Sequence, residues 1–146
     1  MKKKRFALLT LSVLLLIGTV LAGGCAGSAT LAPETSTQVE DVSALEAHAL
    51  IRNNLNNPDF LILDVRTPEE FAAGHIEGAI NTDFYEGAFR DELDALDKNK
   101  DYLLHCRSGS RSQRTLDIMV ELEFAHIYHM TGGIIEWTAE GLPTVK

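Results

Sequence analysis

Short apolar segments alternate with segments of helical periodicity along most of the chain. The clearest apolar segment, residues 60–65, carries a carboxylate near its end and is typical of a strand buried on both faces of a sheet. Further strands are expected at residues 79–81, 102–106 and 127–130, each separated from the next by enough chain for a helix. This alternation predicts an α/β fold, with a mostly parallel central sheet and helices on both faces.

Two capping boxes mark where helices begin. Ser43 stands three residues before Glu46, and Thr67 stands three residues before Glu70 with a proline between them. In each box the hydroxyl accepts from a backbone N–H of the first turn, and the glutamate accepts from the N–H of the capping residue. We expect helices after both boxes. Further helices are expected over residues 86–96, from the loop after residue 106 to about residue 122, and over 134–140.

A single cysteine lies where such folds usually place their chemistry, at the carboxyl end of a strand. Cys106 ends the strand expected at 102–106 and precedes a loop rich in Gly, Ser and Arg, which leads into a helix. Loop amides and a helix N-terminus attract anions, and the same field favours thiolate over thiol. We interpret Cys106 as a candidate nucleophile and the loop as a cradle for a bound anionic group. The expected cradle residues are Arg107, Ser108, Gly109, Ser110, Arg111 and Ser112.

The first 38 residues are not expected to belong to the folded domain. A basic segment, residues 2–5, precedes an apolar stretch, residues 6–21, of the length of a signal-peptide core. The sequence before Cys25 resembles the lipobox of bacterial lipoproteins, although Ala22 stands where Leu is usual. We therefore expect a signal peptide at 1–24, a lipidated Cys25 with a flexible linker at 25–38, and a domain at 39–146. Ordinary cleavage near Cys25 and a retained membrane anchor are the alternatives.

Cysteine count and charge limit the partners of the exported chain. If Cys25 carries lipid, Cys106 is the only thiol left and no intramolecular disulfide can form. Loss of the four basic residues at 2–5 leaves nine Lys and Arg against 21 Asp and Glu, so the formal charge moves from −8 to −12. A domain this acidic is poorly suited to nucleic acid. Membrane contact is therefore expected through the lipid, with the domain facing the periplasm or the cell exterior.

Several motifs follow one another in a fixed order between residue 39 and the carboxyl terminus. They are Asp64-Val65-Arg66, Glu70-Phe71, the segment from Gly74 to Asn81, the cysteine loop from Cys106 to Ser112, and Gly132-Gly133 with Trp137. With these motifs in this order, the chain resembles a single-domain rhodanese. The resemblance implies the rhodanese-like α/β fold over the whole of that region.

The resemblance also implies a thiosulfate sulfurtransferase that needs no cofactor. Cys106 would attack the outer sulfur of thiosulfate, or of another sulfane-sulfur donor, and would become a persulfide as sulfite leaves. A thiol or cyanide would then accept the sulfur. The loop amides from Arg107 to Ser112 would stabilise the persulfide as an anion. No metal is expected, and the domain is expected to be a monomer.

Two other functions stay open on the sequence. Related phosphatases use a Cys-x5-Arg loop, whereas Arg111 makes the loop Cys-x4-Arg, and a loop one residue shorter favours a single sulfur over a tetrahedral phosphate. The second alternative is a module that binds or carries persulfide sulfur for a partner protein. The presence of Cys106 argues against a purely scaffolding role.

Several polar residues near the loop have a structural interpretation. Asp64 and Arg66 are expected to form an ionic strut that supports the loop, rather than an acid–base pair. Arg111 could hold the shape of the loop or bind the substrate's sulfonate. His105 is expected to be structural, as is His75. Glu123 stands near the helix end where the family often has Gly, which costs about 1 kcal/mol if the backbone there is left-handed.

Overall fold

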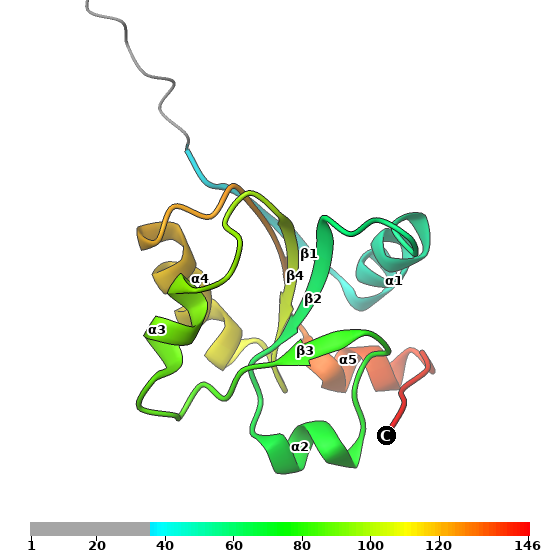
Figure 1. The fold of residues 1–146 in the computed structure, drawn as a ribbon. Coiled ribbons are helices and arrows are strands. Elements are labelled where there is room, and N and C mark those ends of the chain that lie inside the picture. Colours follow the sequence, from blue (N-terminus) through cyan, green and yellow to red (C-terminus); the bar gives the residue numbers. More distant parts are fainter. Residues whose placement is uncertain (1–35) are drawn as a thin grey trace, which may run out of the picture. The chain divides into compact units, whose positions relative to one another are not determined.

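The computed structural model describes residues 36–146, in which five strands form one sheet with helices on both faces (Figure 1). The strands are β1 (Gln38–Val42), β2 (Phe60–Asp64), β3 (Ala79–Asn81), β4 (Asp101–His105) and β5 (His126–Met130). Their order is β1-β5-β4-β2-β3, and each of the four strand pairs is parallel. The predicted α/β fold with a mostly parallel sheet is confirmed.

The central strands are the ones that the apolar pattern predicts, and the edge strand β1 is the one that it misses. In β4 every residue after Asp101 is buried, and β2 is nearly as well covered. In β1 only Val42 is buried, because the strand lies at the edge of the sheet and pairs with β5 alone. Its polar side chains face solvent, so its sequence lacks the apolar signal of a central strand.

Both capping boxes begin helices as expected. The helices are α1 (Ala44–Asn53), α2 (Pro68–Ala73), α3 (Phe89–Asp94), α4 (Ser110–Glu121) and α5 (Gly133–Ala139). The Ser43 and Thr67 hydroxyls accept the N–H groups of Glu46 and Glu70, and both reciprocal bonds are present. Helix α3 is shorter than predicted, because residues 83–88 form hydrogen-bonded turns and Ala88 offers no side-chain cap.

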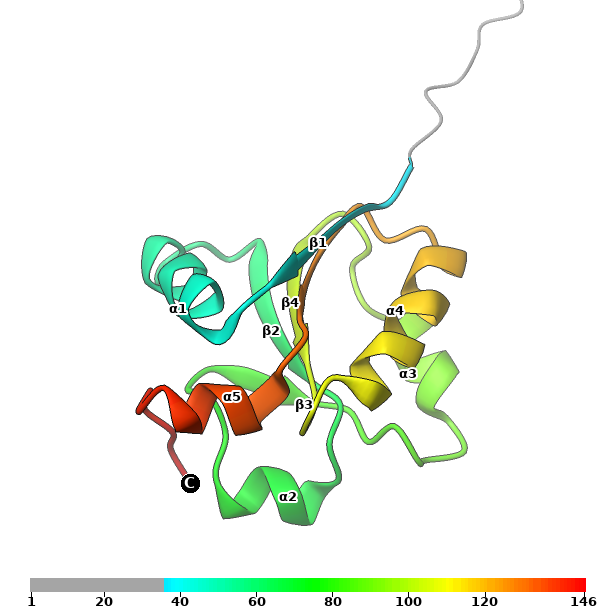
Figure 2. The ribbon, with the colours of Figure 1, turned by 180° about the vertical axis from the view of Figure 1, so that it is seen from behind.

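The helices cover the sheet as two layers (Figures 1 and 2). Helices α3 and α4 pack on one face, where Leu93 and Met119 are fully buried against β2 and β4. Helices α1 and α5 cover the other face, where Ala47 and Trp137 lie in a second core. Both faces are covered, so chemistry is expected at the carboxyl ends of the strands. The carboxyl ends of β2, β4 and β5 lead into α2, α4 and α5.

Helix α4 is followed by a residue in the left-handed conformation, which is the condition under which the sequence assigned a cost to Glu123. Glu123 has φ +63° and follows the last turn of the helix. The N–H of Phe124 donates to the carbonyl of Met119 (3.1 Å) and that of Glu123 to Val120 (3.0 Å), which is a Schellman motif. Glycine is the residue best suited to this position, and the glutamate is strained there.

The expectations for the amino terminus lie outside the described residues. These are the signal peptide at 1–24, the lipidated Cys25 and most of the linker at 25–38. Strand β1 begins at Gln38, one residue before the expected start of the domain. Within residues 36–146, no helix combines the length and apolar character that crossing a membrane requires.

Candidate active site

The cysteine loop lies at the carboxyl end of the central strand β4. Asp64, the last residue of β2, is the register partner of His105, the last residue of β4. The N–H of Val65 donates to the His105 carbonyl (3.0 Å), which extends the pairing up to the point where Cys106 begins the loop. The side chain of Cys106 belongs to the core on the α3 and α4 side of the sheet.

Hydrogen-bond donors converge on the Cys106 sulfur. The backbone N–H groups of Ser112, Ser108 and Arg111 point at Sγ, and the Ser112 hydroxyl lies 3.5 Å from it. Burial by itself raises the pKa of the Cys106 thiol, but these hydrogen bonds outweigh it, and the pKa lies below its ordinary value. Cys106 is 1% exposed, yet its surroundings favour thiolate, unlike those of an inert core cysteine.

The loop keeps its shape because one glycine turns it. Gly109 has φ +88° and stands immediately before α4. A Cβ at this position would come within 2.0 Å of the Thr131 carbonyl oxygen, so any side chain would push the loop away from β5. The turn directs the first amides of α4 toward Sγ, where the helix N-terminus adds its own positive potential.

A second glycine holds the back of the loop against α5. The N–H of Ile134 donates to the Cys106 carbonyl (2.9 Å), and that of Ile135 donates to the Arg107 carbonyl (3.1 Å). Gly133 has φ +58°, and a Cβ there would lie 2.6 Å from both of these carbonyl oxygens. The Gly132-Gly133 motif, noted in the sequence for its family likeness alone, is therefore part of the support for the loop.

Arg111 forms a bidentate ion pair with Glu70, a contact that the sequence analysis missed. Its Nη1 lies 2.6 Å from Glu70 Oε2 and its Nη2 lies 2.8 Å from Oε1. The Arg111 hydrogen bonds hold the pKa of the Glu70 carboxyl below its usual range. The ion pair holds the shape of the loop, which is one of the two roles considered for Arg111, and binding of the substrate's sulfonate stays a prediction. Glu70 is also the capping-box glutamate of α2, and that local role left no sign of a second partner 41 residues away.

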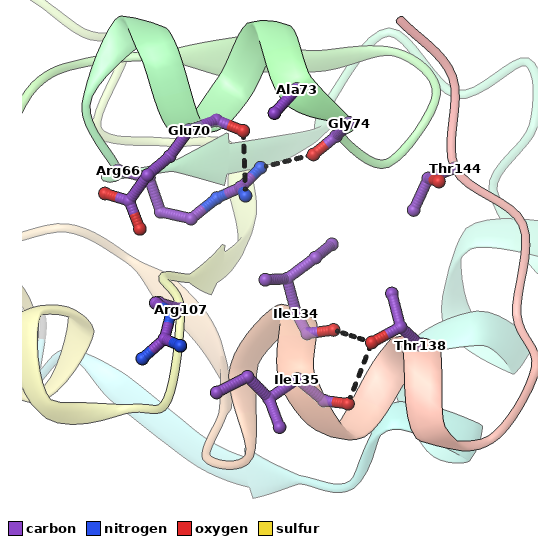
Figure 3. A pocket seen from close by; sticks show the side chains of 9 residues that line it. All are labelled: Arg66, Glu70, Ala73, Gly74, Arg107, Ile134, Ile135, Thr138 and Thr144. Atoms are coloured by element: carbon purple, nitrogen blue, oxygen red, sulfur yellow. Dashed lines mark hydrogen bonds between the residues drawn. The ribbon is translucent and has the colours of Figure 1, made fainter.

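Asp64 and Arg66 form the expected strut. Arg66 Nη2 lies 2.6 Å from Asp64 Oδ2, and Nε lies 3.0 Å from Oδ1; both side chains are almost fully buried. The remaining donors of Arg66 reach the carbonyls of Glu70 (3.1 Å) and Gly74 (2.9 Å), so they tie the segment after β2 to the middle of α2 and to its C-cap (Figure 3). A guanidinium used in this way supports the site and is not a proton donor for it.

The two histidines interpreted as structural are held away from the sulfur. His75 stacks on Phe71 with ring centroids 3.8 Å apart, and its Nδ1 lies 3.0 Å from the Phe71 carbonyl. His105 is fully buried, and burial lowers its pKa. Its Nδ1 lies 3.3 Å from the Cys106 carbonyl, while Nε2 has no hydrogen-bond partner and lies 3.7 Å from Asp64 Oδ2.

The outer side of the loop borders a pocket of about 320 Å³ between α2 and α5 (Figure 3). Arg107 is exposed and lies at this pocket, whereas Ser108 and Ser110 face solvent and Gly109 and Ser112 are buried. The residues that line the pocket are Arg66, Glu70, Ala73, Gly74, Arg107, Ile134, Ile135, Thr138 and Thr144. Arg107 is therefore the expected cradle residue whose side chain is best placed to meet a negatively charged molecule.

The arrangement suits covalent chemistry at sulfur. A lowered thiol pKa supplies a nucleophile, and convergent N–H donors can stabilise negative charge that develops near Sγ. Among residues 36–146, no three His, Cys, Asp or Glu side chains gather closely enough to hold a metal ion. The expected roles of Cys106 as nucleophile and of the loop in substrate binding stay predictions.

Comparison with known proteins gives a consistent result. Residues 47–140 match the model of a family described as "Rhodanese-like domain". A sulfurtransferase of Allochromatium vinosum is 30% identical over 104 residues, which cover 71% of this chain and 95% of that protein. A tRNA uridine(34) hydroxylase of Photorhabdus laumondii is 32% identical over 103 residues, but the match spans only 29% of that protein.

Solved structures with the same fold cover nearly the whole described domain. A rhodanese-related protein from Thermoplasma volcanium superposes with a TM-score of 0.60 at 29% identity, over 73% of this chain and 97% of that one. A rhodanese-like domain protein from Staphylococcus aureus gives a TM-score of 0.56 at 28% identity, over 73% and 99%.

Proposed function

Because the chain belongs to the rhodanese-like family, we propose that it is a sulfurtransferase that moves the sulfane sulfur of thiosulfate through a persulfide on Cys106. The observation that carries the proposal is the set of three backbone amides and one hydroxyl directed at Sγ. Such donors stabilise an anionic sulfur, which both the resting thiolate and a persulfide present. The chain also covers almost the full length of the Allochromatium sulfurtransferase, which supports the same class of reaction.

The reaction has two steps, each at sulfur. The Cys106 thiolate attacks the outer sulfur of thiosulfate, and the S–S bond of the donor breaks with its electron pair leaving on sulfite. A thiophilic acceptor, cyanide or a thiol, then attacks the outer persulfide sulfur. The S–S bond to Cys106 breaks and regenerates the thiolate, so no external oxidant, reductant or cofactor enters. Arg107, at the mouth of the neighbouring pocket, would attract the anionic donor.

The same persulfide supports a second role, that of a carrier that hands sulfur to a partner protein. This role differs from the first only in its acceptor. The similarity to a tRNA uridine(34) hydroxylase does not extend to substrate, because the chain spans less than a third of that enzyme and is strongly acidic.

We further propose that the domain acts outside the cytoplasm on a lipid tether, as a monomer. The support is the basic segment, the apolar stretch and the small residues before Cys25. With the signal removed and Cys25 acylated, the linker up to β1 would separate the domain from the membrane surface.

Treatment of the purified chain with thiosulfate tests the mechanism. We expect mass spectrometry to find one added sulfur atom on the peptide that contains Cys106, and cyanide to remove it as thiocyanate. Cys106→Ala should lose both the adduct and all thiocyanate formation, while Cys25→Ala should keep them. An adduct that survives in Cys106→Ala would contradict the proposal. Hydrolysis of an aryl phosphate without thiocyanate formation would favour the phosphatase alternative.

A further inference from the structure

His129 is a buried histidine that the two-step mechanism does not use, and it lies next to the cysteine loop. It is 2% exposed, in β5, on the face of the sheet that α4 covers. Its Nε2 lies 3.0 Å from the Ser112 hydroxyl, and its Nδ1 lies 3.0 Å from Asp41 Oδ1. Ser112 in turn lies 3.5 Å from the Cys106 sulfur.

These contacts form a continuous line from solvent to the thiol. Asp41 belongs to β1 and is the register partner of His129; its side chain is 67% exposed. Ser112 belongs to α4 and is fully buried, and His129 is 2% exposed. Leu104, the register partner of His129 on β4, is apolar. Asp41 is the charged group in contact with the outer end of the line, and the charge of Arg111 acts on Cys106 at the inner end.

The chemistry of the three groups fixes where the protons lie. An ionised carboxylate only accepts hydrogen bonds, so the nitrogen next to Asp41, Nδ1, carries a proton. In neutral His129 the other nitrogen, Nε2, is then an acceptor, and it shares the single Ser112 hydroxyl proton with the Gly109 carbonyl, which also lies 3.0 Å from Ser112 Oγ. The Ser112 oxygen is left to accept the Cys106 S–H. In the imidazolium form Nε2 donates to Ser112, and the hydroxyl proton is free to donate to a thiolate.

We propose that Ser112, His129 and Asp41 form a proton relay that takes the thiol proton of Cys106. As the S–H bond breaks, its proton passes to Ser112 Oγ while the hydroxyl proton of Ser112 passes to His129 Nε2. The products are a thiolate and an imidazolium, so the total proton count does not change. The Asp41 carboxylate stabilises the imidazolium, and the reverse transfer restores the thiol. His129 acts through Ser112 and is a positioning residue.

The relay deepens the proposed function and rests on it for its biological purpose, but it can be tested on the thiol alone. The rate of Cys106 alkylation by iodoacetamide, followed on the full chain by the mass of its peptide, reports the thiolate fraction without any sulfur donor or acceptor. Failure of thiosulfate to load the wild type would therefore count against the sulfurtransferase proposal and leave the alkylation result intact.

His129→Gln separates a proton relay from a packing role, because glutamine can hydrogen-bond to Ser112 but does not titrate. We expect its alkylation profile to move to higher pH by about one unit, which slows alkylation at neutral pH about tenfold. His126→Gln is the matched control, since His126 lies at the other end of β5 and faces Asp101 at 3.4 Å without contact to the thiol. Its profile should coincide with that of the wild type.

A wild-type profile in His129→Gln, or an equal shift in His126→Gln, would overturn the relay. Asp41→Asn provides a second test that places little stress on folding, because its side chain is mostly exposed. The variant keeps a hydrogen-bond acceptor for Nδ1 but removes the charge that stabilises the imidazolium. Its profile should move in the same direction as that of His129→Gln and by less. An unshifted profile in folded Asp41→Asn would contradict the proposal even if His129→Gln failed to fold.

Discussion

At the scale of single residues, the site depends on side chains that each make two kinds of contact. Glu70 caps α2 through Thr67 and also binds both terminal nitrogens of Arg111. Ser112 contacts the Cys106 sulfur and His129. Glu70 and Ser112 each lie in a helix and each contact a residue far away in the sequence. A change at either position should therefore affect both the stability of the helix and the reactivity of the thiol.

Glu70→Gln should reduce stability in a way that depends on pH. The folded-state pKa of Glu70 lies below its ordinary value near 4.5, so ionised Glu70 contributes stability above that value and loses it as pH falls through the folded pKa. We expect the wild type to exceed Glu70→Gln by about 1 kcal/mol in the free energy of unfolding over roughly pH 5 to 8. Denaturant titrations should show this difference shrinking steadily in more acidic solution.

Glu69→Gln is the matched control for that comparison. Glu69 is the adjacent acid in the first turn of α2 and is exposed. Its replacement should change the free energy of unfolding by a few tenths of a kcal/mol at most, with little dependence on pH. A pH-independent loss in Glu70→Gln would mean that the ion pair with Arg111 does not contribute as its geometry suggests.

At the scale of elements, the ends of helices decide how well the loop is supported. The amino end of α4 supplies amides to the sulfur, and its carboxyl end returns the chain to β5 through the strained Glu123. The amino end of α5 holds two loop carbonyls through Ile134 and Ile135. These three helix ends should respond differently to substitution. The carboxyl end of α4 is strained at Glu123, the amino end of α5 has no room for a side chain at Gly133, and the amino end of α4 provides hydrogen-bond donors to the sulfur.

Glu123→Gly should stabilise the domain. A glycine relieves the left-handed conformation at φ +63°, and we expect a gain of about 1 kcal/mol in the free energy of unfolding. Glu140→Gly, at the end of α5 with φ −76°, relieves no strain and should cost about 0.5 to 1 kcal/mol through the greater freedom of the unfolded chain. Chemical denaturation of both variants measures whether the free energy of unfolding rises in Glu123→Gly and falls in Glu140→Gly. A fall in both variants would show that Glu123 is not strained.

Gly133→Ala should damage the active loop more than the fold as a whole. The added Cβ meets the Cys106 and Arg107 carbonyl oxygens at 2.6 Å, so the loop must shift. We expect the rate of persulfide formation to fall at least tenfold and the free energy of unfolding to fall by about 1 to 3 kcal/mol.

Gly141→Ala is the matched control, because Gly141 has a similar backbone conformation, φ +71°, and open space around an added Cβ. It should lose about 1 kcal/mol from backbone strain and keep its activity; equal loss of activity in both would contradict the role of Gly133.

At the scale of the whole molecule, the proposed tether would act together with the charge of the chain. Removal of the expected signal segment would leave a strongly acidic chain, which bulk electrostatics would keep away from anionic lipid. A lipid on Cys25 would hold it there by insertion of acyl chains instead. Membrane association should therefore depend on one residue and not on salt.

Cys25→Ser should release the protein from membranes. With full-length chain expressed in a bacterial host, we expect the wild type to partition into a detergent-rich phase and Cys25→Ser into the aqueous phase. Cys106→Ser is the control and should partition like the wild type, because it leaves the lipidation position unchanged. Retention of Cys25→Ser in the detergent phase would indicate an uncleaved apolar anchor, residues 6–21.

Local periodicity and short-range hydrogen bonding were enough to predict the α/β fold, the central strands, both capping boxes and the position of Cys106 at a strand end. They do not predict β1, because a strand at the edge of the sheet lacks the apolar pattern of a central strand. The pairing of Arg111 with Glu70, and the alignment of Asp41, His129 and Ser112 beside the thiol, arise only when the chain folds. Such contacts join side chains 17 to 88 residues apart, and their geometry depends on strand order and register, which no local pattern encodes.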